Sequence, residues 1–184
     1  PRWGPCYRLL VVRGRRNPFH FGFAARLRRA RKAVDLSCSG LPQRAGLLDG
    51  KSVLLLEQGQ RVPRLDTVER VAYALGLSPA FLAYGIEADA SQPSEGLRSE
   101  GVASRLRQCR ADRGLSVLGL ATWAGLSHNA VRSTERGASM PTLATAEALA
   151  IALGVSAGWL AYGLGPMELP GRRRVAASPA VSPG

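Results

Sequence analysis

Apolar residues recur at helical spacing between residues 102 and 163, in the second half of the chain. Leu106 and Cys109 fall on one face of a first predicted helix over 102–113. Gly114 follows, and a glycine at this place can adopt the left-handed conformation that often ends a helix. The spacing therefore predicts an amphipathic helix with a defined end.

Two short helices are predicted next, joined by a sharp turn at Gly125. Residues 118–124 form the first of them, and Gly125 supplies the backbone freedom that the turn needs. Ser127 is suited to cap the second helix through its hydroxyl, and that helix is predicted to run to Arg136. Trp123, on the first helix of the pair, is expected to pack rather than to face solvent.

A fourth and a fifth helix complete this region. Pro141 is predicted to start the fourth, which runs to Leu153, because proline fits the first helical position. Ser156 is predicted to cap a short fifth helix that carries Trp159 and Leu160. The stretch is thus predicted to be a compact five-helix domain.

The same pattern occurs earlier in the chain as an internal repeat. A shift of 79 residues pairs 26–28 with 105–107, and a shift of 78 pairs 82–85 with 160–163. About 27 identities over roughly 62 positions support the repeat, and the first copy has one extra residue between Leu47 and Val53. Two copies indicate paired domains rather than a long solenoid.

Composition divides the chain into five segments. Residues 1–22 are predicted to be a basic, disordered arm, and residues 164–184 a disordered tail. Residues 86–101, rich in Ser, Gly, Glu and Pro, are predicted to be a flexible linker. The two copies then occupy residues 23–85 and 102–163. The predicted fold class is all-α, with two tandem five-helix domains.

The net charge of +12 is unevenly distributed. Residues 1–32 hold ten Arg or Lys and no acidic residue, whereas residues 33–171 carry a net charge of −1. A basic arm and first helix can contact phosphates without sequence preference. A solvated basic stretch with no ligand is an equally good interpretation of the charge alone.

Side chains that carry chemistry are scattered. The three cysteines, Cys6, Cys38 and Cys109, are far apart and the two histidines, His20 and His128, stand alone, so neither a disulfide framework nor a zinc site is predicted. Paired carboxylates and a phosphate-cradling glycine loop are missing, so we expect no catalytic residue, no cofactor and no enzyme activity. No apolar run approaches a membrane span, and we expect a cytoplasmic protein.

The pair of short helices around Gly125 fits a helix-turn-helix unit. In such a unit the first helix packs against the second, which lies in the major groove, so the side chains between the two helices must be small. Ala121 supplies the small contact, and Val131 is expected to point into the core. The residues that share the opposite face can all hydrogen-bond base edges or phosphates, and they are His128, Asn129, Arg132 and Ser133.

This arrangement resembles the lambda-repressor/Cro-like helix-turn-helix family, also called the xenobiotic-response-element type. The resemblance runs through the whole second copy, at positions such as Ala121, Ala124, Gly125, Leu126, Ser127, Val131, Glu135, Arg136, Gly137, Leu153, Gly154 and Trp159. It implies a five-helix domain whose third helix reads double-stranded DNA. The base contacts that the resemblance implies come from His128, Asn129, Arg132 and Ser133. Ser127 and Arg136 are further candidate DNA-binding residues. The family often has a phosphate-contacting glutamine where this chain has Val117.

The resemblance also implies an ion pair between the first and third helices of each copy. In the second copy the pair is Arg110 with Glu135, and in the first it is Arg31 with Glu57.

The first copy departs from the pattern. Pro42 stands where the second copy has Ala121, so the second helix is predicted to be shortened or displaced. The outward face of the third helix becomes Gly50, Lys51, Leu54 and Leu55, of which Lys51 is kept as a candidate DNA contact. Packing, dimerisation or nonspecific phosphate binding is expected here rather than base reading.

The function predicted from these residues is sequence-specific transcriptional regulation through the third helix of the second copy. One five-helix unit reads only a few base pairs, so two readers are needed, from a homodimer or from both copies in one chain. The alternative is a protein-interaction or antitoxin-like module that uses the apolar outer face of the first copy.

Overall fold

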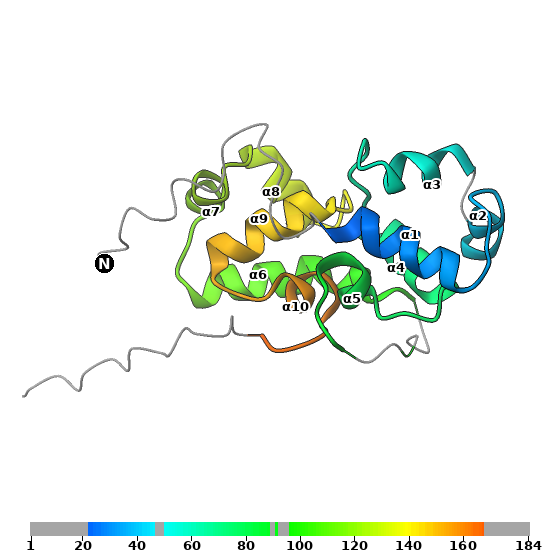
Figure 1. The fold of residues 1–184 in the computed structure, drawn as a ribbon. Coiled ribbons are helices and arrows are strands. Elements are labelled where there is room, and N and C mark those ends of the chain that lie inside the picture. Colours follow the sequence, from blue (N-terminus) through cyan, green and yellow to red (C-terminus); the bar gives the residue numbers. More distant parts are fainter. Residues whose placement is uncertain (1–21, 47–49, 89–90, 92–95, 168–184) are drawn as a thin grey trace, which may run out of the picture.

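The regular structure of the protein is helical. The computed structural model describes residues 22–46, 50–88, 91 and 96–167 (Figure 1). Among these residues the only pairing of extended backbone is an isolated bridge between Arg64 and Thr142, and all other regular elements are helices. The predicted all-α fold class is confirmed for this part of the chain. The predicted basic arm, apart from Gly22, and most of the predicted tail lie outside the described residues.

In the described part of the chain, ten α-helices form two groups of five that follow the two copies of the repeat. The first module comprises α1 (Phe23–Ala33), α2 (Gly40–Ala45), α3 (Gly50–Glu57), α4 (Leu65–Ala74) and α5 (Pro79–Tyr84). The second module comprises α6 (Val102–Asp112), α7 (Val117–Ala124), α8 (His128–Glu135), α9 (Leu143–Leu153) and α10 (Ala157–Tyr162). The five helices predicted for residues 102–163 are confirmed.

Glycines end the second module's helices where the sequence predicts. The chain turns through left-handed glycines at Gly114, Gly125, Gly137 and Gly154, with φ between 60 and 69°. In this conformation a Cβ is strained, so each position suits glycine. The helix ends are therefore encoded locally.

The start of the fourth helix of the second module differs from the prediction. Thr142 is the N-cap of α9, and its hydroxyl accepts a hydrogen bond from the Thr145 N–H at 3.2 Å. Pro141 lies outside the helix, and its carbonyl accepts the Leu65 N–H of the first module at 3.0 Å. The prediction that Pro141 starts the helix is wrong because this segment pairs with the other module instead.

The two modules share a cluster of buried apolar residues. A cluster of buried residues around α1, α4 and α5 also includes residues of the second module, namely Val102, Leu143, Ala146, Ala161, Tyr162 and Leu164. A second cluster, centred on Leu106, Leu120 and Leu149, belongs to the second module alone. Helices α5 and α10 lie against each other between the modules (Figure 1). The modules are therefore packed together rather than tethered.

The contacts between the modules repeat as equivalent pairs. The Leu65 N–H donates to the Pro141 carbonyl, and the Leu143 N–H donates to the Pro63 carbonyl, both at 3.0 Å. Leu65 matches Leu143 in the repeat, and Pro63 matches Pro141. Each module therefore offers the other the same surface, as the subunits of a twofold dimer do.

Two tyrosines reinforce this exchange. The Tyr84 hydroxyl donates to the Leu143 carbonyl, and the equivalent Tyr162 hydroxyl donates to the Leu65 carbonyl, both at 3.4 Å. Tyr162 is 1% exposed, and burial raises its pKa well above the ordinary value. The phenol thus stays neutral and able to donate.

The end of the predicted linker is ordered. Arg98–Gly101 forms a 3₁₀ helix, η3, in front of α6. The buried Glu69 carboxylate of α4 accepts the backbone N–H groups of Arg98 and Ser99 at 2.7 and 2.8 Å. The prediction of a flexible linker is wrong for these four residues, because a carboxylate of the first module holds their backbone.

Candidate nucleic-acid interface

Helices α7 and α8 form a tight pair across Gly125. Gly125 has φ of 64°, and beyond it the Leu126 N–H returns to the Ala121 carbonyl at 2.9 Å. Ala121 is 1% exposed and Val131 is fully buried, so small and branched side chains fill the contact behind α8. The Ser127 hydroxyl caps α8 by accepting the Ala130 N–H at 3.2 Å. The pair thus holds α8 at the surface of the module.

The outward face of α8 carries the predicted candidate residues. Their side chains are exposed except that of Ser133, which is half-buried and donates its hydroxyl to the Ser139 hydroxyl at 3.1 Å. The exposed ones are Ser127, His128, Asn129, Arg132 and Arg136. The helix therefore offers an amide, an imidazole and two guanidinium groups to a ligand outside the module.

An ion pair fixes the end of α8 to α6. The Arg110 guanidinium donates to both Glu135 carboxylate oxygens, at 2.6 and 3.2 Å, and to the Leu115 carbonyl at 2.7 Å. The Glu135 side chain is only 7% exposed. A bidentate pair of this kind restricts the orientation of both groups. The predicted pairing of these two residues is confirmed.

The same ion pair occurs in the first module. Arg31 donates to the two Glu57 oxygens at 2.6 and 2.9 Å and to the Leu36 carbonyl at 2.6 Å. The hydrogen bond to Glu57 is the main cause that raises the pKa of Arg31. Since this pair also joins the first and third helices, α3 is held on its module as α8 is.

The surface of α3 is different in chemistry. Helix α2 has six residues where α7 has eight, and it contains Pro42, as predicted for a shortened helix. On α3, Lys51 is exposed, Leu54 is 44% exposed and Leu55 is half-buried. Leucine side chains have no hydrogen-bonding group. This face is therefore much poorer in donors and acceptors than that of α8.

Trp123 does not pack as predicted. Its side chain is 53% exposed on α7, although the next residue, Ala124, is buried, and Leu118 on the same helix is 64% exposed. In the repeat Trp123 occupies the place of Arg44, which is exposed on α2. The position is a surface position in both modules. The charged residue at this place in the first copy could have indicated that Trp123 is exposed.

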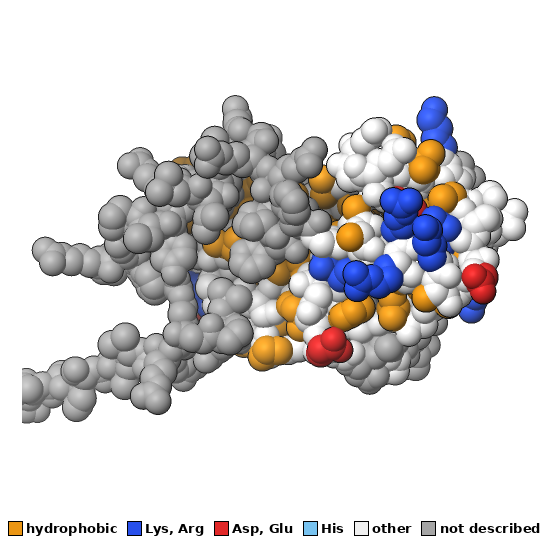
Figure 2. Space-filling model, in the orientation of Figure 1, with side chains coloured by type: hydrophobic (Ala, Val, Ile, Leu, Met, Phe, Trp, Pro, Cys, Tyr) orange, Lys and Arg blue, Asp and Glu red, His pale blue; other side chains and the backbone are white. Residues whose placement is uncertain are grey.

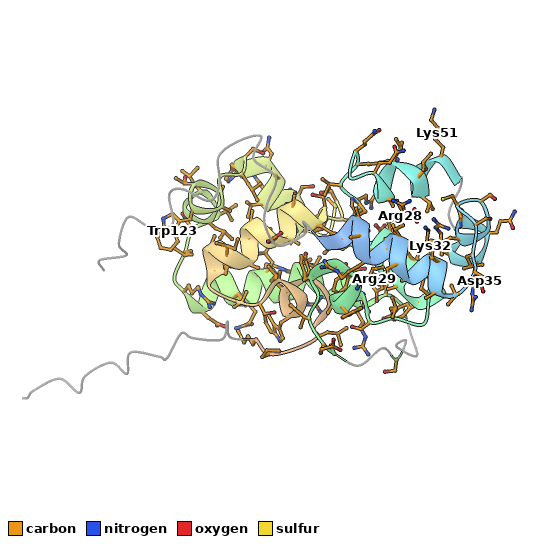
Figure 3. All side chains as sticks on the ribbon, viewed as in Figure 1. Arg28, Arg29, Lys32, Asp35, Lys51 and Trp123 are labelled. Atoms are coloured by element: carbon orange, nitrogen blue, oxygen red, sulfur yellow. The ribbon has the colours of Figure 1, made fainter. Side chains whose placement is uncertain are left out.

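Cations gather on α1 beside α3. Arg28, Arg29 and Lys32 are exposed there, and Figure 2 shows Lys and Arg side chains close together on the visible face of the first module. Together with Glu57 they line a shallow hollow of about 450 Å³ between the two helices. In Figure 3, Arg28 lies between α1 and α3, and Lys51 projects from α3 away from the module. A basic first helix was predicted from the sequence, but its position next to α3 was not.

Comparison with known families gives a match to both modules. The family described as a helix-turn-helix domain matches residues 23–83 and again residues 102–161. The chain belongs to the helix-turn-helix domain family. No curated protein and no solved structure matched the chain. The two helix-turn-helix matches cover α1 to α5 and α6 to α10, which agrees with the tandem arrangement predicted from the repeat.

Helix-turn-helix domains place a helix against DNA, so the family indicates a DNA-binding regulator. None of the described helices is long and apolar enough to cross a membrane. Within the same residues no group of three or more His, Cys, Asp or Glu side chains is placed to hold a metal ion.

Proposed function

We propose that the protein is a non-enzymatic, sequence-specific transcriptional regulator of the lambda-repressor/Cro type that reads an operator through α8. Regulation follows from occlusion of polymerase or from contact with it. The observation that carries the proposal is the outward face of α8, where polar side chains cluster on a helix that its neighbours hold in place.

The chemistry of these side chains suits base edges in the major groove. The exposed amide of Asn129 offers a donor and an acceptor, the pair of groups that adenine presents there. Arg132 matches guanine or a phosphate, and His128 adds a further hydrogen-bonding group. Ser127 and Arg136, at the two ends of α8, are assigned to the phosphates on either side, and Ser133 to a base or a phosphate.

The experiment is a DNA-binding titration of the full chain. A specific duplex is first selected from a random pool, and its affinity is compared with that of a scrambled duplex by fluorescence anisotropy at one salt concentration. Asn129→Ala should weaken binding to the selected duplex by about 1–3 kcal/mol, or roughly 5- to 150-fold, because the adenine contact is lost. Binding to the scrambled duplex should change little.

The matched control is Gln108→Ala. Gln108 is also an exposed amide, but it lies on α6 and donates to Asp112 at 2.7 Å. This variant should bind both duplexes as the unaltered chain does. An unaltered chain that binds selected and scrambled duplexes equally well would refute the proposed function.

A second candidate function is protein interaction through the first module. Leu54 and Val62, on α3 and the loop behind it, are each 44% exposed, and exposed apolar side chains on a helix face often mark a contact surface. In that case Leu54→Ser should alter self-association or partner binding and leave DNA affinity unchanged.

A further inference from the structure

One chain already contains the paired arrangement that helix-turn-helix proteins usually reach with two chains. The modules exchange equivalent backbone contacts at the starts of α4 and α9, and α5 packs against α10. The core that they share is buried within the chain. Helices α3 and α8 both lie along the upper side of the molecule in Figure 1. A duplex that lies against α8 on this side therefore also passes the first module.

The two modules offer this duplex different chemistry at equivalent positions. On α8 the outward face carries His128, Asn129, Arg132 and Ser133. At the matching places α3 has Gly50, Lys51, Leu54 and Leu55. Lys51 is the single side chain of the second set that can donate a hydrogen bond, and a lysine ammonium acts as a point charge toward a phosphate.

Positive charge is distributed in the opposite sense. On α1, Arg28, Arg29 and Lys32 are all exposed cations beside α3. At the equivalent places on α6 the second module has Arg107, Gln108 and Ala111, which together carry one positive charge. The first module thus has fewer polar groups where bases would be read and more positive charge on α1 than the second module has on α6.

We propose that one chain binds an asymmetric DNA site, in which the second module reads bases and the first grips phosphates without regard to sequence. This inference rests on the proposed function and adds the form of the target to it. The phosphate contacts of the first module come from Arg28, Lys32 and Lys51. Their contribution to affinity is electrostatic, so it is the same for any sequence and falls as salt rises.

The first experiment determines the form of the site. Duplexes selected from a random pool by the full chain should share one short conserved block with no inverted repeat of it. Sedimentation of the chain with a selected duplex should show one chain per duplex. An inverted repeat, or two chains on one duplex, would overturn this inference while leaving the proposed function standing. Selection that enriches no sequence would remove the proposed function and the inference together.

The second experiment removes the phosphate contacts of the first module. In the triple variant Arg28→Ala, Lys32→Ala, Lys51→Ala, affinities for the selected and the scrambled duplex should fall by the same factor. The slope of log K against log salt concentration should become shallower by about 2–3, since each lost phosphate contact removes about 0.9. All three side chains are exposed, and the far-UV circular dichroism should stay unchanged.

The matched control also removes three exposed cations. Arg44→Ala, Arg70→Ala, Arg113→Ala changes the net charge equally, but these side chains lie away from the hollow between α1 and α3. The control should keep most of the salt slope. Equal slopes in the two triple variants would overturn the assignment of the phosphate contacts to Arg28, Lys32 and Lys51. Loss of discrimination between duplexes in the first variant would show that the first module reads bases, and would overturn it too.

Discussion

A cavity in the first module should destabilise the second, because the two share a core. Leu41 is fully buried on α2, which lies at the end of the first module far from α10 (Figure 1). Replacing it with alanine removes buried methyl groups and leaves a cavity, which lowers the free energy of unfolding by about 2–5 kcal/mol. For a chain of this size each kcal/mol lowers the melting temperature by about 2–4 °C, so the expected decrease is about 4–20 °C.

Tryptophan fluorescence makes the second module the reporter. Trp123 and Trp159 both lie there, and Trp3→Phe removes the remaining tryptophan, which belongs to the arm. In this background Leu41→Ala should lower the fluorescence midpoint and the circular dichroism midpoint together, as in a single cooperative transition. Leu120→Ala, within the second module, provides the comparison.

Independent domains would behave differently. The fluorescence midpoint of the Leu41→Ala chain would then stay at its original temperature, while circular dichroism would separate into two transitions. That result would show that the shared core contributes little to stability and that the two modules unfold independently.

Three further predictions follow from buried polar groups. Glu135→Ala should lower the free energy of unfolding by about 3–5 kcal/mol in urea titrations, because it leaves the Arg110 charge half-buried and without its partner; a loss below about 1 kcal/mol, as for a surface pair, would contradict this. Glu69→Gln weakens the acceptor for two backbone groups, so the Ser99 amide should exchange with deuterium faster, and unchanged exchange would argue against the role given to Glu69. Burial and the hydrogen bond to Glu69 raise the pKa of Tyr73 to about 12, so its contribution to stability is complete below pH 10 and is lost as pH rises towards 12. Tyr73→Phe should therefore flatten the pH dependence of unfolding in that range, and an unaltered slope would count against it.

Local features of the chain were predictable from sequence because they depend on near neighbours. Gly125 ends α7 and Ser127 caps α8 as their residue types suggest. The Arg110–Glu135 ion pair was predictable for a different reason, since it came from a resemblance that extends over the whole second copy.

Contacts between the copies were not predictable in the same way. Leu65 and Leu143 were indistinguishable from ordinary core positions, and nothing in helical spacing shows that their backbones pair with the prolines of the opposite module. Serine, glycine and glutamate suggest a mobile linker, yet Glu69, about thirty residues earlier, holds the end of that linker. Such long-range contacts depend on how the modules pack, which local patterns do not encode.

The candidate site was predictable in part. Exposure of Asn129 and Arg132 follows from helical periodicity once Val131 is placed in the core. Trp123 was misplaced because size and hydrophobicity favour burial on average, whereas α7 contacts its neighbours mainly through Leu120, Ala121 and Ala124.

The exchange of equivalent contacts within one chain has a consequence for how binding strength can change. In a homodimer each substitution appears in both subunits, so its effect on the complex with DNA is counted twice. Here a substitution at Asn129 appears once, and Lys51 at the equivalent place is unaffected. Affinity for DNA can therefore change in smaller steps, and the sequence of one module can change while that of the other stays the same.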